Sequence, residues 1–136
     1  MARLHLKIVT PEKEIFDEDV DQVNVPSSEG QLGILPNHVN LMAKVVPGEL
    51  QIKRGLQTQL LASGSGFIEV AGNQVTLLTD MAEDAEDIDE EAVKEAKKRA
   101  EKTLEDVLSD EEYAETLASL EKSLARLKVK RRHRSR

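Results

Sequence analysis

The spacing of apolar residues changes once along this chain, near residue 81, and this change constrains the fold more than any other feature. Up to residue 80, apolar residues recur at every second position, as in a β-strand with one buried face. Beyond it they recur three and four residues apart, as in an α-helix with one buried face. The sequence therefore predicts a β domain over residues 1–84 and a helical domain over residues 85–136.

The first domain is predicted to contain many short strands. Its alternating apolar residues are Leu4, Leu6 and Ile8, then Val23 and Val25, then Leu50 and Ile52, then Phe67, Ile68 and Val70, then Val75, Leu77 and Leu78. Turn-forming pairs such as Thr10-Pro11, Pro47-Gly48 and Gly72-Asn73 separate these runs. Short strands with a turn about every eight to twelve residues are typical of an antiparallel sandwich or barrel.

The second domain is predicted to be a helical hairpin. One apolar stripe comprises Val93, Ala96, Ala100, Leu104 and Val107, and the other comprises Tyr113, Leu117, Leu120, Leu124 and Leu127. Asp87 or Asp89 can cap the first helix, and Ser109 with Glu112 has the spacing of a capping box for the second. Because the first stripe is mostly Ala and Val, the seam buries little apolar area. We therefore expect a hairpin that can detach and pack elsewhere.

Charge is distributed unevenly along the chain. Residues 1–121 hold all 26 acidic residues and 11 of the 19 basic ones, whereas residues 122–136 hold the other 8 basic residues. A basic end of this kind either is simply solvated or meets an acidic partner. Direct binding of nucleic acid is not expected, because the remaining chain is acidic and only 2% aromatic, so it offers no surface for base stacking.

No catalytic or metal site is predicted. The three histidines, His5, His38 and His133, have no nucleophile and acid at a recognisable spacing, and there is no Cys. The acidic run from Glu83 to Glu91 is interpreted as a solvated linker and helix start. No apolar run approaches the roughly 20 residues of a membrane helix, so direct membrane insertion is not expected.

Residues 30–38, which read GQLGILPNH, contain two glycines, a proline and a histidine. This stretch is not a phosphate-binding loop, because no Gly-Lys-Ser/Thr follows and Pro36 argues against a helix. The glycines fit a tight turn and a bulge. We expect Leu32, Ile34 and Leu35 to anchor this loop to the core. Its exposed polar tip, which comprises Ser27, Ser28, Glu29 and Gln31, would then be a docking surface.

Longer segments carry a resemblance to a known family. The segments SSEGQLGILPNH, PGEL, SGSGFIEV and VTLLTDMAED, in this order and spacing, resemble those of the epsilon subunits of bacterial and chloroplast F-type ATP synthases. The resemblance covers nearly the whole chain. It implies a β-sandwich of about ten antiparallel strands followed by an α-helical hairpin. It also implies a non-catalytic rotor subunit of the central stalk, peripheral on the cytoplasmic face of the inner or plasma membrane.

The resemblance also implies partners and contact residues. The sandwich would join the gamma subunit to the c-ring, and the hairpin would extend to inhibit ATP hydrolysis at the beta and alpha subunits. The docking residues for the c-ring and gamma would be Ser27, Ser28, Glu29, Gly30, Gln31, Gly33 and His38. The inhibitory contact with the beta subunit would use Lys122, Arg126, Lys128, Lys130, Arg131 and Arg132.

Some members of this family bind ATP on the folded hairpin, through an Ile/Leu-Asp-x-x-Arg-Ala motif and additional arginines. Here Ile88 and Asp89 match the motif, and Arg99 and Arg126 stand where helper arginines would. Ala92 replaces the motif arginine and Val93 its alanine. This degenerate site is expected to bind ATP weakly or not at all, because a lost charged contact costs roughly 1.5–3 kcal/mol. No cofactor is therefore expected.

One alternative function is kept beside the rotor subunit. The chain would then be a free-standing acidic adaptor whose basic tail docks on another protein. Co-purification with a large membrane-bound complex distinguishes the two hypotheses.

Overall fold

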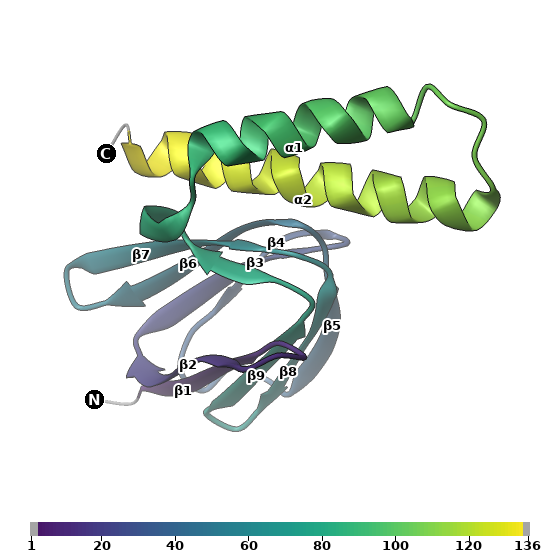
Figure 1. The fold of residues 1–136 in the computed structure, drawn as a ribbon. Helices are drawn as coiled ribbons and strands as arrows, with labels where there is room; N and C mark the ends of the chain where they lie inside the picture. The colour runs from purple at the N-terminus through teal and green to yellow at the C-terminus, as the bar shows by residue number, and fades with distance from the viewer. Residues whose placement is uncertain (1–2, 135–136) are drawn as a thin grey trace.

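The computed structural model describes residues 3–134, and it consists of a β-sandwich with a helical hairpin packed on one side (Figure 1). The strands are β1 Leu4–Val9, β2 Glu14–Val20, β3 Gln22–Ser27, β4 Gly30–Ile34, β5 Leu41–Val45, β6 Gly48–Arg54, β7 Gln57–Ser63, β8 Gly66–Ala71, β9 Gln74–Thr79 and β10 Ala82–Asp84. A short 3₁₀ turn, η1 Ala85–Asp87, leads into α1 Glu90–Thr103 and α2 Asp110–Arg134. The predicted fold class is confirmed.

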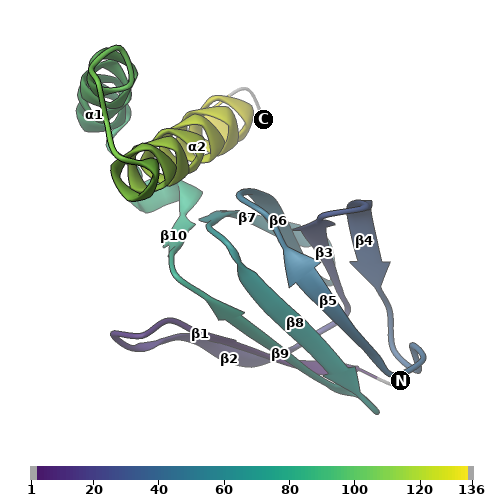
Figure 2. The ribbon, with the colours of Figure 1, turned by 90° about the vertical axis from the view of Figure 1, so that its right-hand side faces the viewer.

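The ten strands form one sheet that folds over on itself into two layers (Figure 2). Their order is β10-β7-β6-β3-β5-β8-β9-β1-β2, and β4 pairs with β3 outside this path. All pairs are antiparallel except β1 with β9, which run parallel from His5 opposite Gln74 to Val9 opposite Leu78. Short turns force consecutive strands to be antiparallel. β1 and β9 are separated by most of the sandwich, so no turn fixes their relative direction.

The sandwich core consists of the inward-facing residues of each strand. Leu4, Leu6 and Ile8 of β1 are fully buried, as the alternation predicted. Within the runs that contain two adjacent apolar residues, only one can face inward, because neighbours in a strand point to opposite faces. Ile68 is buried whereas Phe67 is 57% exposed, and the neighbouring strand β9 likewise exposes Leu78.

A charged cluster lies on the outer face of β1 and β2. His5 is opposite Asp19 in the β1–β2 register, and its Nδ1 lies 2.8 Å from an Asp19 carboxylate oxygen. Its Nε2 contacts Asp17 on the other side. The hydrogen bonds with Asp19 and Asp17 raise the pKa of His5 above its ordinary value. The hydrogen bond with His5 is the main cause that lowers the pKa of Asp17.

This cluster predicts a pH dependence. A raised pKa means that the folded chain binds the His5 proton more tightly than the unfolded chain does. The contribution to stability is therefore complete below the unfolded pKa of about 6.5, and is lost as the pH rises through the folded pKa. In an NMR titration we expect the His5 midpoint above 6.5 in the wild type, and closer to 6.5 in the Asp19→Asn variant. An unchanged midpoint in that variant would contradict the assignment.

The helix caps follow the sequence closely. The Asp89 carboxylate accepts a hydrogen bond from the Ala92 N–H at the start of α1. The hydroxyl of Ser109 accepts from the Glu112 N–H at 3.1 Å, and the Ser109 N–H donates to the Glu112 side chain at 3.3 Å. Both predicted caps are thus confirmed. α1 ends earlier than its apolar stripe, so Val107 lies in the connection and is fully exposed.

The hairpin docks on the sandwich through α2. This helix contacts β6 and β7, while α1 lies on its outer side (Figure 2). A second apolar cluster fills the junction; its members are Leu60, Ala62, Ala85, Ile88, Val93, Leu127 and Val129. The hairpin seam is therefore only part of what α2 buries, and the sandwich supplies the rest. Across residues 3–134, neither helix has the length and apolarity together that a membrane span requires.

Candidate functional site

The predicted docking tip is the turn of the β3–β4 hairpin. Ser27 pairs with Gly30 in the register, and the Ser27 hydroxyl donates to the Gly30 carbonyl at 2.6 Å. The same hydroxyl accepts from the Glu29 N–H, and Gly30 has a φ of 116°, which a residue with a side chain rarely adopts. Residues 28–31 are exposed, so this turn presents short polar groups on a fixed backbone.

The stretch of residues 30–38 is not a single loop, which corrects part of the sequence interpretation. Residues 30–34 form β4 in continuous register with β3, so the expected bulge at Gly33 is wrong. A side chain at Gly33 would instead meet the Asn24 amide oxygen at 3.0 Å. Ile34 is buried, but Leu35 is 55% exposed and does not anchor the loop. β4 ends at Ile34, which is also its last buried residue.

The docking tip lies at the start of β4, whereas His38 follows the end of that strand. Its N–H donates to the Leu35 carbonyl, and its Nδ1 donates to the Val39 carbonyl at 2.7 Å. These contacts belong to the turn that connects β4 with β5. The structure thus separates His38 from the other docking residues, and its side chain supports its own turn.

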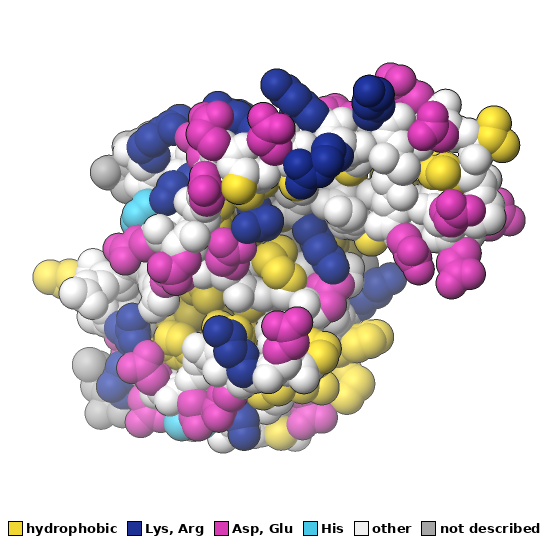
Figure 3. Space-filling view, in the orientation of Figure 1, with side chains coloured by type: hydrophobic (Ala, Val, Ile, Leu, Met, Phe, Trp, Pro, Cys, Tyr) yellow, Lys and Arg dark blue, Asp and Glu magenta, His cyan; other side chains and the backbone are white. Residues whose placement is uncertain are grey.

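An exposed apolar patch, which the sequence did not predict, covers the outer face of β5, β8 and β9. It consists of Met42, Phe67 and Leu78, which are 67%, 57% and 54% exposed. Phe67 and Leu78 are directly opposite in the β8–β9 register. Hydrophobic side chains are visible on this side of the sandwich, below the overhanging hairpin (Figure 3). Contiguous exposed apolar side chains of this kind mark interaction surfaces.

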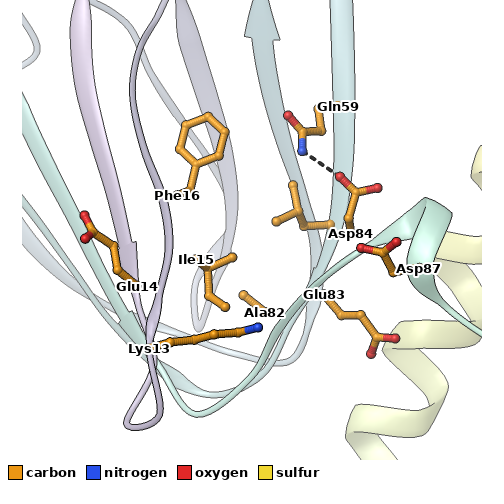
Figure 4. A pocket seen from close by; sticks show the side chains of 10 residues that line it. Lys13, Glu14, Ile15, Phe16, Gln59, Ala82, Glu83, Asp84 and Asp87 are labelled. Atoms are coloured by element: carbon orange, nitrogen blue, oxygen red, sulfur yellow. Dashed lines mark hydrogen bonds between the residues drawn. The ribbon is translucent and has the colours of Figure 1, made fainter.

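A cleft of about 500 Å³ opens between the two ends of the sheet, β2 and β10. Ile15, Phe16 and Ala82 form its apolar floor, and Lys13 extends across it toward β10 (Figure 4). The Asp84 carboxylate accepts from the Gln59 amide and from the Glu86 N–H. The lining includes no His, Ser or Cys; its charged groups are Lys13 and the carboxylates of Glu14, Glu83, Asp84 and Asp87. Among residues 3–134, no cluster of His, Cys, Asp and Glu has the form of a metal site.

The basic residues of α2 face the chain's own acidic residues. Lys122 lies 2.9 Å from Asp80, Arg126 lies 2.8 Å from Glu83, and Arg132 lies 3.3 Å from Glu49. Lys130 donates to the Ala85 carbonyl at 3.0 Å. Basic and acidic side chains accordingly alternate along the hairpin and its junction with the sandwich (Figure 3).

Glu90 ties the start of α1 to the end of α2. Its carboxylate accepts from Arg131 at 3.3 Å and contacts Arg134. Burial by itself raises the pKa of Glu90, but the hydrogen bond from Arg131 and the charges of Arg134 and Lys94 outweigh it and lower the pKa. Of the six predicted contact residues, Lys128 is exposed and lines a hollow of about 360 Å³ beside Gln31 and Arg132. Residues 135 and 136 of the basic tail lie outside the described residues.

The acidic partners of α2 are the residues that sequence reasoning missed. Glu83 and Asp84 belong to β10 and are half-buried, and the Glu90 side chain is only 15% exposed, so the interpretation of the acidic run as solvated is wrong at these three positions. Glu86, Asp87 and Asp89 are exposed and fit it. β10 has only three residues, which are too few to show a strand period in the sequence.

Two family models match consecutive parts of the chain. The beta-sandwich domain of the ATP synthase delta/epsilon chain matches residues 3–85, and the long alpha-helix domain of the same chain matches residues 86–131. The chain belongs to the ATP synthase delta/epsilon chain family. The predicted resemblance is thereby confirmed, and members of this family are structural subunits of ATP synthase.

Curated members of the delta/epsilon family match over nearly their whole length. The ATP synthase epsilon chain of Chloroflexus aggregans is 46% identical over 132 residues, which are 96% of this chain and 94% of that protein. The epsilon chain of Dehalococcoides mccartyi strain BAV1 is 44% identical over 135 residues, or 98% of this chain and 96% of that protein.

Solved structures share the fold of this family. A chain of the Euglena gracilis mitochondrial ATP synthase, from a structure of OSCP, F1 and c-ring, has a TM-score of 0.78 and 22% identity, over 92% of this chain and 79% of that one. A chain of the Tetrahymena thermophila mitochondrial ATP synthase central stalk and c-ring has a TM-score of 0.65 and 15% identity, over 93% and 96%. At these identities the likeness concerns the fold alone.

The residues that match the ATP motif of some delta/epsilon family members have structural roles here. Ile88 is 3% exposed in the junction cluster, and Asp89 caps α1. Arg126 is paired with Glu83, and Arg99 is exposed on α1. Three of these four residues are therefore already engaged by neighbouring groups of the protein.

Proposed function

We propose that the chain is a non-catalytic central-stalk subunit of a proton-translocating F-type ATP synthase, peripheral on the cytoplasmic face of the membrane. Its family and the epsilon chains that match it over nearly their full length support this proposal. The observation that carries the regulatory part is the docking of α2, since its basic side chains are held by the sandwich through partly exposed ion pairs.

The sandwich offers two separate surfaces for coupling. The polar turn of residues 28–31 suits the polar loops of the c-ring, because it exposes backbone and short side chains without a hydrophobic patch. The apolar patch of Met42, Phe67 and Leu78 suits the gamma subunit, because a rotor joint must bury apolar area to transmit torque. A subunit that holds both surfaces on one rigid sheet can couple gamma to the c-ring.

The hairpin acts as a switch with a folded and an extended state. In the folded state α2 covers Leu60 and Ala62 of β7. In the extended state the basic residues Lys122, Arg126, Lys128, Lys130, Arg131 and Arg132 contact acidic groups of the beta subunit beside the alpha subunit, and ATP hydrolysis stops. The same chemistry, charge-assisted hydrogen bonds to carboxylates, serves both states.

Truncation tests the switch. We expect a chain that ends at Asp87 to retain its sandwich, because the core of that domain contains only residues from the strands. ATP hydrolysis by the assembled catalytic head should be inhibited by the full chain and released with the truncated one. Binding of both chains to gamma serves as the control. Equal hydrolysis with both chains, at equal binding, would overturn the inhibitory role and leave the coupling role.

ATP binding is proposed to be weak or absent. Ala92 cannot supply the charge of the motif arginine, and Arg126 would have to leave Glu83 to reach a nucleotide. We expect calorimetric titration of the isolated chain to give a dissociation constant weaker than about 1 mM, which corresponds to roughly 4 kcal/mol of binding free energy. The Ala92→Arg, Val93→Ala variant, which completes the motif, is the matched comparison. Micromolar affinity in the wild type would contradict the proposal.

A further inference from the structure

In the docked hairpin, three of the basic side chains that the proposed inhibition uses lie along one face of α2. Lys122, Arg126 and Lys130 are four residues apart, so they form a row on one face of α2, about 6 Å between neighbours. Along this row the chain places the Asp80 carboxylate, the Glu83 carboxylate and the Ala85 carbonyl in the same order. Each basic side chain of the row thus meets an acceptor group between residues 80 and 85, and the order is the same along both segments.

We propose that Asp80, Glu83 and Glu49 form a charge latch that competes with the acidic surface of the beta subunit for the same basic side chains. The inference rests on the proposed inhibitory switch and adds what sets its balance. A side chain such as Arg126 cannot pair with Glu83 and with a partner carboxylate in the same geometry. The strength of the acidic side of the latch therefore determines how much of the population is docked.

The ion pairs of the latch are weak enough to break when the hairpin opens. The side chains of Lys122 and Asp80 are 33% and 42% exposed, so water screens their attraction and the pair contributes little. Glu83 and Arg126 are less exposed, at 24% and 28%, and Arg126 donates one hydrogen bond through Nη2 to a Glu83 oxygen at 3.1 Å. This pair is stronger than the Lys122–Asp80 pair, because it is less exposed and water screens it less.

Glu49 has two opposite effects on docking. Its ion pair with Arg132 favours the docked state, whereas its burial disfavours that state. It lies on β6 in contact with α2, where it is only 6% exposed. One oxygen accepts from the Gln51 amide at 2.6 Å and pairs with Arg132, while the other is buried without a hydrogen-bond partner among residues 3–134. Keeping a half-satisfied carboxylate from water disfavours the docked state. When the favourable and unfavourable contributions to docking are close in size, both the docked and the open state can be populated.

The latch predicts different effects on inhibition when the acidic and the basic partner of one ion pair are replaced. Glu83→Gln weakens docking but leaves Arg126 intact for the partner, so inhibition should increase. Arg126→Gln weakens docking equally but removes the side chain that both states use, so inhibition should not increase. Glu12→Gln removes an exposed carboxylate from the β1–β2 turn, away from α2, and is the matched control for net charge.

Docking is measured on the isolated full chain, separately from inhibition. The chain has no Cys, so Gln57→Cys and Ser119→Cys, both at exposed positions, allow energy transfer between dyes on β7 and α2. We expect Glu83→Gln and Arg126→Gln each to lower the docked-to-open ratio about fivefold, and Glu12→Gln to leave it unchanged. In the assembled catalytic head, only Glu83→Gln should then inhibit ATP hydrolysis more strongly than the wild type.

The two readouts separate failure of the latch from failure of the proposed function. An unchanged docked-to-open ratio in Glu83→Gln would overturn the latch, whatever inhibition does. A lowered ratio with unchanged inhibition in both variants would overturn the inhibitory switch. Increased inhibition in Arg126→Gln as well would overturn the competition, because it would show that the partner does not use this side chain.

Discussion

Replacing Leu127 with alanine is expected to release the hairpin from the sandwich. Leu127 is 3% exposed and belongs to the junction cluster with Leu60 and Ala62 of β7 and Val93 of α1. Its truncation removes apolar area and leaves a cavity between two separate units of structure. We expect docking to be weakened by about 2–4 kcal/mol, since the hairpin can move to close part of the cavity.

The measurement is the docked-to-open ratio of the isolated chain, which should fall about 30-fold to 1000-fold. Leu124→Ala is the matched control, because Leu124 lies one turn away on α2 and is 45% exposed. Its removal should change the ratio by less than about fivefold. If both variants behaved alike, the junction cluster would not be what holds the hairpin. Increased inhibition of ATP hydrolysis by Leu127→Ala would further support the switch.

Replacing Leu6 with alanine is expected to destabilise the sandwich itself. Leu6 is fully buried on β1, the strand whose two neighbours are β2 and β9. A cavity there sits between both layers, and the rolled sheet cannot collapse into it without shifting its register. We expect a loss of about 3–4 kcal/mol in the free energy of unfolding, which lowers the Tm by about 12–30 °C in a domain of this size.

Leu56→Ala provides the corresponding control. Leu56 has the same side chain, but it lies in the β6–β7 turn and is fully exposed. Its truncation should change the free energy of unfolding by less than about 0.5 kcal/mol. Denaturant unfolding of the chain ending at Asp87 isolates the sandwich from the hairpin. A loss below about 1 kcal/mol for Leu6→Ala would show that the core is less tightly packed than its burial indicates.

Sequence patterns predicted the parts of this protein that depend on neighbouring residues. The alternation at Leu4, Leu6 and Ile8 predicted both a strand and the face it buries. The capping box at Ser109 placed the start of α2 within one residue. Strand period, helix period and caps are all set within a few residues of the chain, so they can be read without knowing the fold.

Some predictions failed where two local signals competed. Phe67 and Ile68 are adjacent apolar residues, and the pattern alone does not decide which one faces the core. Leu35 looked like an anchor because it follows Ile34, yet it lies beyond the end of β4. At Phe67 and Ile68 the pleat of the strand allows only one of two neighbours to be buried, and the strand's partners decide which one.

The sequence by itself determined the fold class, with strands followed by two helices, the helix caps and the family. The tertiary structure alone decided the parallel pairing of β1 with β9, the apolar patch of Met42, Phe67 and Leu78, and the partners of the basic helix. Arg126 and Glu83 are 43 residues apart in the chain, and the pair exists only because α2 packs across β6 and β7. Contacts between distant residues depend on how whole elements pack, and no local period specifies that packing.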